Sequence, residues 1–144
     1  MYLSTEDEVS VVTIQDGQST DEAVVEALAD AASLQGTIQE LVLFEVEVGS
    51  GTEVTEGSTV TVHYAGNTQE GVQFDNSYER GEPFTFTLGE GKVIEGWEQG
   101  LTGMKEGGRR ALVIPARMAY GSRQVGPIPP NSTLVFIVEV LEVR

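Results

Sequence analysis

The sequence predicts an α+β fold, in which one short helix lies across an antiparallel sheet of about five strands, plus an N-terminal helical extension. Three observations lead to this fold class. From residue 38 onward, apolar residues recur with a period of two, which is typical of strands. Glycine-rich turns separate these segments, so neighbouring strands can pair. Between the strands, only residues 93–104 have a helical character.

An acidic extension (1–36) is predicted to precede one domain (37–144), a division that fits a chain of 144 residues. Within the extension, residues 9–14 (VSVVTI) fit either a short strand or an apolar linker. No internal repeat is present.

A helix is predicted near 20–35. Ser19 and Glu22 have the spacing of a capping box, and Gly36 is suited to end the helix. Apolar residues between them recur at helical spacing. The apolar face is rich in alanine and would bury little area, so the helix is expected to dock weakly or stay mobile, and self-association through it is left open.

The strands are predicted from alternation of apolar and polar residues. In the first strand, one set of alternating positions is apolar and the other ends in glutamates, which indicates a half-buried strand. The predicted strands are 38–48, 59–64, 84–88, 110–114 and 134–143.

Residues 93–104 (VIEGWEQGLTGM) predict a very short helix that glycine turns enter and leave. Val93, Ile94 and the lone Trp97 are expected to point the same way. No cysteine, serine or histidine nucleophile stands near them. A tryptophan beside two aliphatic residues therefore predicts an apolar floor for a bulky ligand.

The formal net charge is −15. This charge argues against nucleic acid as a partner, because phosphate binding needs clustered lysines and arginines. Two interpretations of the charge stay open, namely solubility through self-repulsion and attraction of basic clients.

No cofactor and no metal site are expected. His63 is the only histidine, there is no cysteine, and the acidic residues do not have the spacing of a calcium loop. The segment 89–92 (GEGK) has part of a phosphate-binding loop pattern but lacks its full spacing, so a turn is predicted. Nucleophilic catalysis with a histidine base is also not expected.

No segment has the roughly 20 apolar residues of a membrane span, so no span is expected in this chain. The predicted location is cytoplasmic, or extracytoplasmic if an upstream signal or anchor was removed.

Five motifs occur in a fixed order along the second part of the chain. They are VHYAG (62–66), GVQFDNS (71–77), PFTFTLGEGKVIEGWEQGLTGM (83–104), VIPARMAYG (113–121) and GPIPPNSTLVFIVEVLEV (126–143). With these motifs, residues 38–144 resemble FKBP-type peptidyl-prolyl cis–trans isomerases. The resemblance implies a strongly twisted sheet that wraps around the short helix.

The resemblance also implies an aromatic pocket that binds proline. The implied catalytic residues are Tyr64, Asp75, Ile94 and Tyr120. The implied substrate-binding residues are Phe74, Phe84, Val93, Trp97, Ile128 and Phe136. Arg80 matches the family's ion-pair partner of this carboxylate. The role of Asp75 is left open between positioning Tyr64 and acting electrostatically on the rotating amide. Phe86 is expected in the core.

The predicted function is a peptidyl-prolyl cis–trans isomerase that assists protein folding; the alternative is a non-catalytic proline-peptide binding or chaperone module. Rotation about a peptide bond crosses a barrier of about 18–20 kcal/mol without bond making, so a dry pocket can catalyse it.

The implied partners are proline-containing segments of client proteins and macrolides such as rapamycin. The loop 121–131, about one residue shorter than in small family members, bears on macrolide affinity. The chaperone-flap subclass of the family has a long insertion between the positions of Tyr64 and Trp97. This chain has no such insertion, so it is not expected to belong to that subclass.

Overall fold

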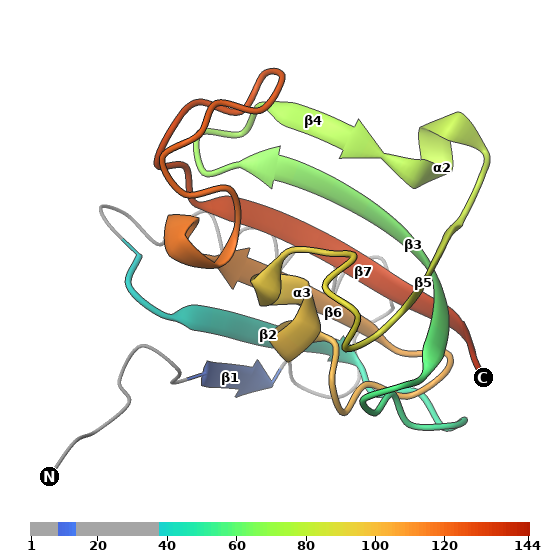
Figure 1. Ribbon diagram of the computed structural model, residues 1–144. Helices are drawn as coiled ribbons and strands as arrows, with labels where there is room; N and C mark the ends of the chain where they lie inside the picture. Colours follow the sequence, from blue (N-terminus) through green and yellow to red (C-terminus); the bar gives the residue numbers. More distant parts are fainter. Residues whose placement is uncertain (1–8, 14–37) are drawn as a thin grey trace, which may run out of the picture.

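The computed structural model describes Val9–Thr13 and residues 38–144, which contain one seven-stranded sheet (Figure 1). The strand order is β1-β2-β6-β7-β3-β4, and β5 pairs with β3. The strands are β1 (Val9–Thr13), β2 (Leu41–Glu47), β3 (Thr59–Thr68), β4 (Gln73–Asn76), β5 (Phe84–Thr87), β6 (Arg109–Ile114) and β7 (Leu134–Val143). The helices are α2 (Ser77–Arg80), α3 (Glu95–Gly100) and the 3₁₀ turn η2 (Ala116–Met118).

The strands β2, β6, β7 and β3 form an antiparallel centre, as the alternation predicted. On β3 every second residue from Val60 to Thr68 is buried, which aligns Val62, Tyr64 and Gly66 on the face toward α3. The opposite edge of β3 is shared by β5 and β4. The predicted α+β class is therefore confirmed.

The sheet has two more strands than the five that the sequence predicted. β4 (QFDN) contains a single apolar residue, so its sequence shows no alternation of apolar and polar residues. β1 pairs in parallel with β2 at the sheet edge, so the apolar segment near residue 9 is a strand rather than a linker.

The predicted helix at 20–35 lies outside the described residues, and the boundary at residue 37 stays a prediction. Among the described residues, no helix has both the length and the hydropathy that crossing a membrane requires.

The strand β2 is apolar on both faces, so the half-buried strand predicted there is corrected. Leu41 and Leu43 belong to the core between the sheet and α3, and Phe44 packs on the reverse face. The reverse-face cluster of buried residues contains Phe44, Ala111, Val113, Val135 and Ile137.

Helix α3 lies unusually close to β6 because two of its residues have no side chain. A Cβ atom on Gly96 would lie 2.4 Å from Cγ2 of Ile114, and one on Gly100 would lie 2.4 Å from Cδ2 of Leu112. Both distances are well inside van der Waals contact. The two glycines therefore set the distance between the helix and the sheet.

The end of α3 is also fastened to the sheet by a buried arginine. Arg110 on β6 donates to the carbonyl oxygen of Gly100 at 2.7 Å. It also donates to both carboxylate oxygens of Glu45, at 2.9 and 2.7 Å. Because the charge is paired and its donors are used, burial of Arg110 is tolerated.

We predict that Gly96→Ala destabilises the protein. Alanine favours a helix over glycine by up to about 1 kcal/mol. Overpacking against Ile114 should cost about 1–3 kcal/mol and exceed this gain. Thermal or denaturant unfolding measures the difference, with Glu95→Ala at an exposed position of the same helix as the control. A Gly96→Ala variant as stable as the wild type would contradict the close approach.

Candidate active site

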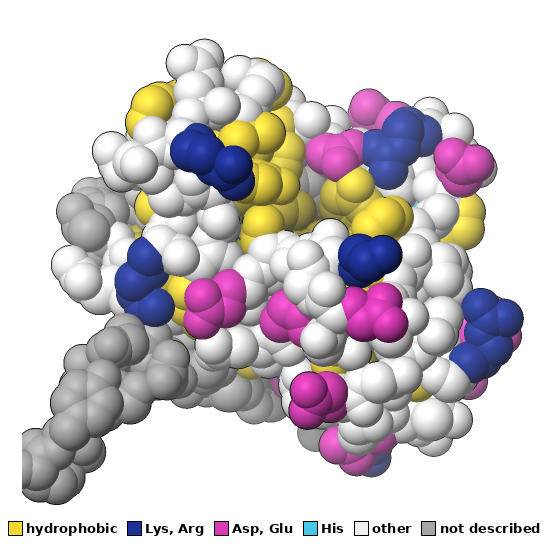
Figure 2. Space-filling model, in the orientation of Figure 1, with side chains coloured by type: hydrophobic (Ala, Val, Ile, Leu, Met, Phe, Trp, Pro, Cys, Tyr) yellow, Lys and Arg dark blue, Asp and Glu magenta, His cyan; other side chains and the backbone are white. Residues whose placement is uncertain are grey.

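A cavity of about 440 Å³ opens on the face where α3 and η2 lie. Figure 2 shows apolar side chains gathered in a hollow on this face, with charged side chains at its border. The cavity is lined by Tyr64, Phe74, Asp75, Phe84, Gly91, Lys92, Val93, Ile94, Trp97, Ala119, Tyr120, Arg123 and Phe136.

The floor of the cavity is the ring of Trp97, which is only 4% exposed. The Tyr64 ring meets it edge-on at 5.0 Å between centroids, and the Phe136 ring does so at 5.4 Å. Edge-to-face contacts of this kind add to the stability that burial provides and fix the orientation of the rings. The floor and two walls thus form one rigid aromatic unit.

A third wall depends on a glycine in β3. Phe74 and Phe136 meet edge-on at 5.5 Å. A Cβ atom on Gly66 would lie 2.7 Å from Phe136 and 2.8 Å from Phe74. Only glycine leaves room for both rings here, which explains the glycine of the VHYAG motif in physical terms.

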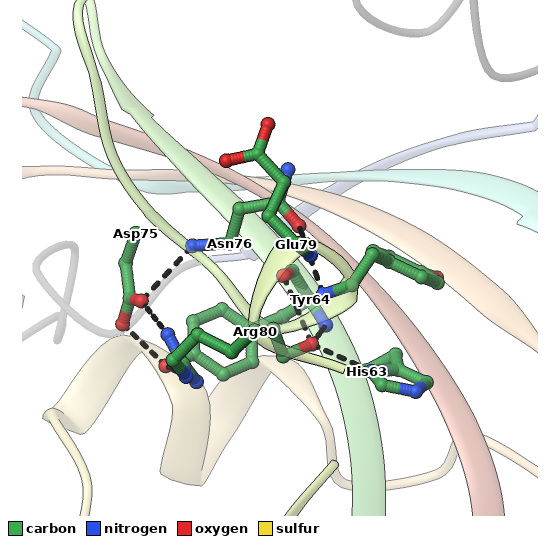
Figure 3. A network of polar contacts seen from close by, with 8 residues as sticks. His63, Tyr64, Asp75, Asn76, Glu79 and Arg80 are labelled. Atoms are coloured by element: carbon green, nitrogen blue, oxygen red, sulfur yellow. Dashed lines mark hydrogen bonds and ion pairs between the residues drawn. The ribbon is translucent and has the colours of Figure 1, made fainter. Parts of the chain in front are cut away.

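The polar side of the cavity is a network of Tyr64, Asp75 and Arg80 (Figure 3). The Tyr64 hydroxyl donates to Oδ2 of Asp75, and Nη1 of Arg80 donates to Oδ1 of Asp75. Nη2 of Arg80 also donates to the Tyr64 hydroxyl oxygen at 3.3 Å. Burial, and then the Asp75 carboxylate, raise the pKa of the Tyr64 hydroxyl, so it stays protonated at neutral pH.

The single turn α2 delivers Arg80 to this network. The side chain of Asn76 caps the turn by accepting from the N–H groups of Tyr78 and Glu79. The fully buried Ser77 hydroxyl accepts from the Tyr64 N–H at 2.7 Å, which ties α2 to β3. Helix α2 therefore binds Tyr64 at two points: Ser77 binds its backbone N–H, and Arg80 binds its hydroxyl.

His63, next to Tyr64 on β3, does not line the cavity. Its ring stacks on Tyr78 at 4.5 Å, and its Nδ1 lies 2.8 Å from the Ser77 hydroxyl. Figure 3 shows His63 and the Tyr64 ring on opposite sides of the strand. No histidine among the described residues can therefore act directly on a bound ligand.

Ile94 caps the N-terminus of α3 and lines the cavity. Its carbonyl accepts from the N–H groups of Trp97 and Glu98 at 2.9 and 3.1 Å. Its own N–H makes no hydrogen bond within residues 38–144. This N–H can donate to a carbonyl that enters the cavity, which gives a physical role to a residue that the resemblance implied to be catalytic.

The structure brings together nine of the ten predicted site residues. The exception is Ile128, which does not line the cavity. It is 4% exposed in the inner core, and its backbone pairs with Val125. Phe86 is buried in the core as expected, at 5% exposure.

The sequence interpretation missed four lining residues. They are Gly91, Lys92, Ala119 and Arg123. They could have been predicted from their closeness in sequence to predicted site residues, since each lies within three residues of Val93 or Tyr120. Two of the four are basic side chains in a strongly acidic chain.

Comparisons with known proteins agree with this geometry. Residues 50–141 match the family model described as "FKBP-type peptidyl-prolyl cis-trans isomerase". The chain belongs to this family. Its activity is peptidyl-prolyl cis–trans isomerisation.

Relatives and solved structures cover most of this FKBP-type chain. An "FK506-binding protein" of Neisseria meningitidis serogroup A is 49% identical over 104 residues, with 72% of this chain and 95% of the relative covered. "FK506-binding protein 1A" of Neurospora crassa is 49% identical, with 75% and 94% covered. FkpA from Escherichia coli is similar in structure, with a TM-score of 0.69, 41% identity, and 87% of this chain and 62% of that chain covered.

We predict that Asp75→Asn lowers kcat/KM by about 2- to 20-fold, because it keeps the shape but weakens the hold on Tyr64 and Arg80. If Asp75 were a catalytic base, the loss would be about 10²–10⁴-fold. Circular dichroism and a thermal melt would show that the variant is folded. A thousandfold loss in a folded variant would contradict the positioning role.

We also predict that Phe136→Ala and Phe86→Ala separate pocket from core. Loss of the Phe136 wall should weaken proline-peptide binding, whereas loss of the buried Phe86 ring should lower stability by about 3–5 kcal/mol. Binding measured by titration and unfolding measured on the same samples test this. A Phe86→Ala variant that melts like the wild type but no longer binds would reverse the assignment.

Proposed function

We propose that this isomerase binds the proline ring of a client segment on Trp97 and that the amide before the proline rotates inside the cavity. The observation that carries the proposal is the cavity itself: a buried indole floor with aromatic walls on the four strands β3, β4, β5 and β7. A pocket of this size and apolar lining suits a ring and its flanking amide.

The walls favour rotation through their low polarity. A planar amide is resonant and polar, and the twisted amide loses that resonance. An environment without water therefore stabilises the twisted state relative to the planar one. A rate increase of 10⁵-fold requires a differential stabilisation of roughly 7 kcal/mol, which is the magnitude that the cavity has to supply.

Two polar groups would hold the client while the bond turns. The N–H of Ile94, which makes no hydrogen bond within residues 38–144, can donate to a client carbonyl oxygen. Tyr120, which also lines the cavity, supplies a second anchor through its hydroxyl. Both groups act by orientation, so neither has to transfer a proton.

We further propose that macrolides such as rapamycin occupy the same cavity and compete with proline segments. Relatives that are about half identical to this chain are named for binding FK506. A purely proline-binding module is the less favoured alternative, because nine of the ten residues that the resemblance implied line this one cavity.

The test is isomerisation of an X–Pro peptide with and without the protein, between pH 6 and 8. We expect acceleration that rapamycin suppresses and a kcat/KM that is nearly flat with pH. The reason is that His63 lies outside the cavity and that the raised pKa of Tyr64 keeps its hydroxyl protonated in this range. Peptide binding without acceleration would instead support the binding module, and a bell-shaped profile would indicate acid–base catalysis.

A further inference from the structure

Two basic side chains at the border of the cavity are not used by the proposed reaction. All eight lysines and arginines of this chain lie between residues 80 and 144. Within the described residues, ion pairs are formed by Arg80, Arg109 and Arg110. Lys92 and Arg123 line the cavity, are exposed, and make no ion pair within the described part of the chain.

The two cations come from different loops. Lys92 lies between β5 and α3, directly before the cavity residue Val93. Arg123 lies between η2 and β7, three residues after the cavity residue Tyr120. Figure 2 shows basic side chains at separate points around the apolar hollow. A client segment that crosses the hollow would therefore meet a cation on each of two loops.

A second hollow of about 420 Å³ continues from the cavity along β5. It shares Phe84 and Lys92 with the cavity and extends past Thr85 to Thr87. Among the described strands, β5 pairs only with β3. Lys92 stands where a chain leaving the proline site toward β5 would pass.

The cations act against the net charge of the molecule. The chain as a whole carries −15 and repels acidic segments at long range. That repulsion is screened beyond about 8–10 Å at ordinary ionic strength. Asp75, which also lines the cavity, is paired with Arg80, and Glu90 lines the second hollow together with Lys92. A client carboxylate in direct contact with Lys92 or Arg123 lies closer to that cation than to most of the net negative charge, so the contact is attractive.

We propose that Lys92 and Arg123 make this isomerase selective for client segments that carry aspartate or glutamate beside the proline. The carboxylates bind the ammonium and guanidinium groups while the proline ring occupies the cavity. This inference rests on the proposed function and specifies its substrate class. It opposes the alternative in which the acidic surface recruits basic clients.

The experiment measures kcat/KM for peptides with one X–Pro core and glutamate, glutamine or lysine at the flanking positions. For the wild type at low salt, we expect glutamate peptides to exceed glutamine peptides by about three- to tenfold, since each exposed pair contributes up to about fivefold. Added salt should reduce this ratio. Lysine peptides should be the slowest.

Variants assign the preference to the two side chains. In Lys92→Gln and Arg123→Gln the glutamate-to-glutamine ratio should fall, and in the double variant it should approach about 1. Lys92→Glu should raise the relative rate of lysine peptides. Lys105→Gln is the matched control: Lys105 also makes no ion pair within residues 38–144 but lies outside the cavity lining, so the ratio should not change.

Equal rates for glutamate and glutamine peptides in the wild type would overturn the inference, as would a ratio that survives in the double variant. Fastest turnover of lysine peptides would show that net charge, rather than the rim, selects clients. No acceleration of any peptide, the glutamine peptide included, would instead overturn the proposed function. The two failures are therefore distinguishable.

Discussion

The close approach of α3 to β6 is the constraint on which the site depends. Gly96 and Gly100 leave no space for a Cβ atom against the sheet, and Arg110 binds the last carbonyl of the helix. This contact fixes how deeply Trp97 sits and hence the level of the cavity floor. The rings that meet Trp97 edge-on then take their places from it.

The polar side of the site is built separately and converges on Tyr64. One short turn, α2, holds the Tyr64 backbone through Ser77 and the Tyr64 hydroxyl through Arg80 and Asp75. The charged groups therefore face each other and leave the floor apolar. Such an arrangement combines a dry surface for the proline with a fixed wall beside the rotating amide.

How far the sequence predicts the molecule depends on the range of each signal. Period-two alternation predicted the long strands, and it continues on β3 to Thr68. It could not reveal β4, because Phe74 is the only apolar residue of that strand. It could not reveal α2, because the cap from Asn76 and the hydrogen bond to Ser77 exist only in three dimensions. The N-terminal strand β1 was ambiguous, since its partner β2 lies almost thirty residues later in the chain.

The lining residues of the cavity could be predicted where their residue type and sequence context indicate a single role. An isolated tryptophan between glycines predicted the floor, and the family motifs predicted eight further lining residues. Ile128 is buried and does not line the cavity, and a motif position alone does not distinguish a cavity wall from the core. Lys92 and Arg123 were missed because charges on loops carry no periodic signal, and only the folded chain places them around one cavity.

The central claim is that the amide rotates in a dry aromatic cavity without proton transfer. The solvent isotope effect on kcat/KM for a neutral X–Pro peptide tests this claim most directly. Rates in H₂O and D₂O should have a ratio of about 1, because no proton moves in the rate-limiting step. A ratio of about 2 or more, lost in Asp75→Asn, would contradict the account and would make the Tyr64–Asp75 pair an acid–base catalyst.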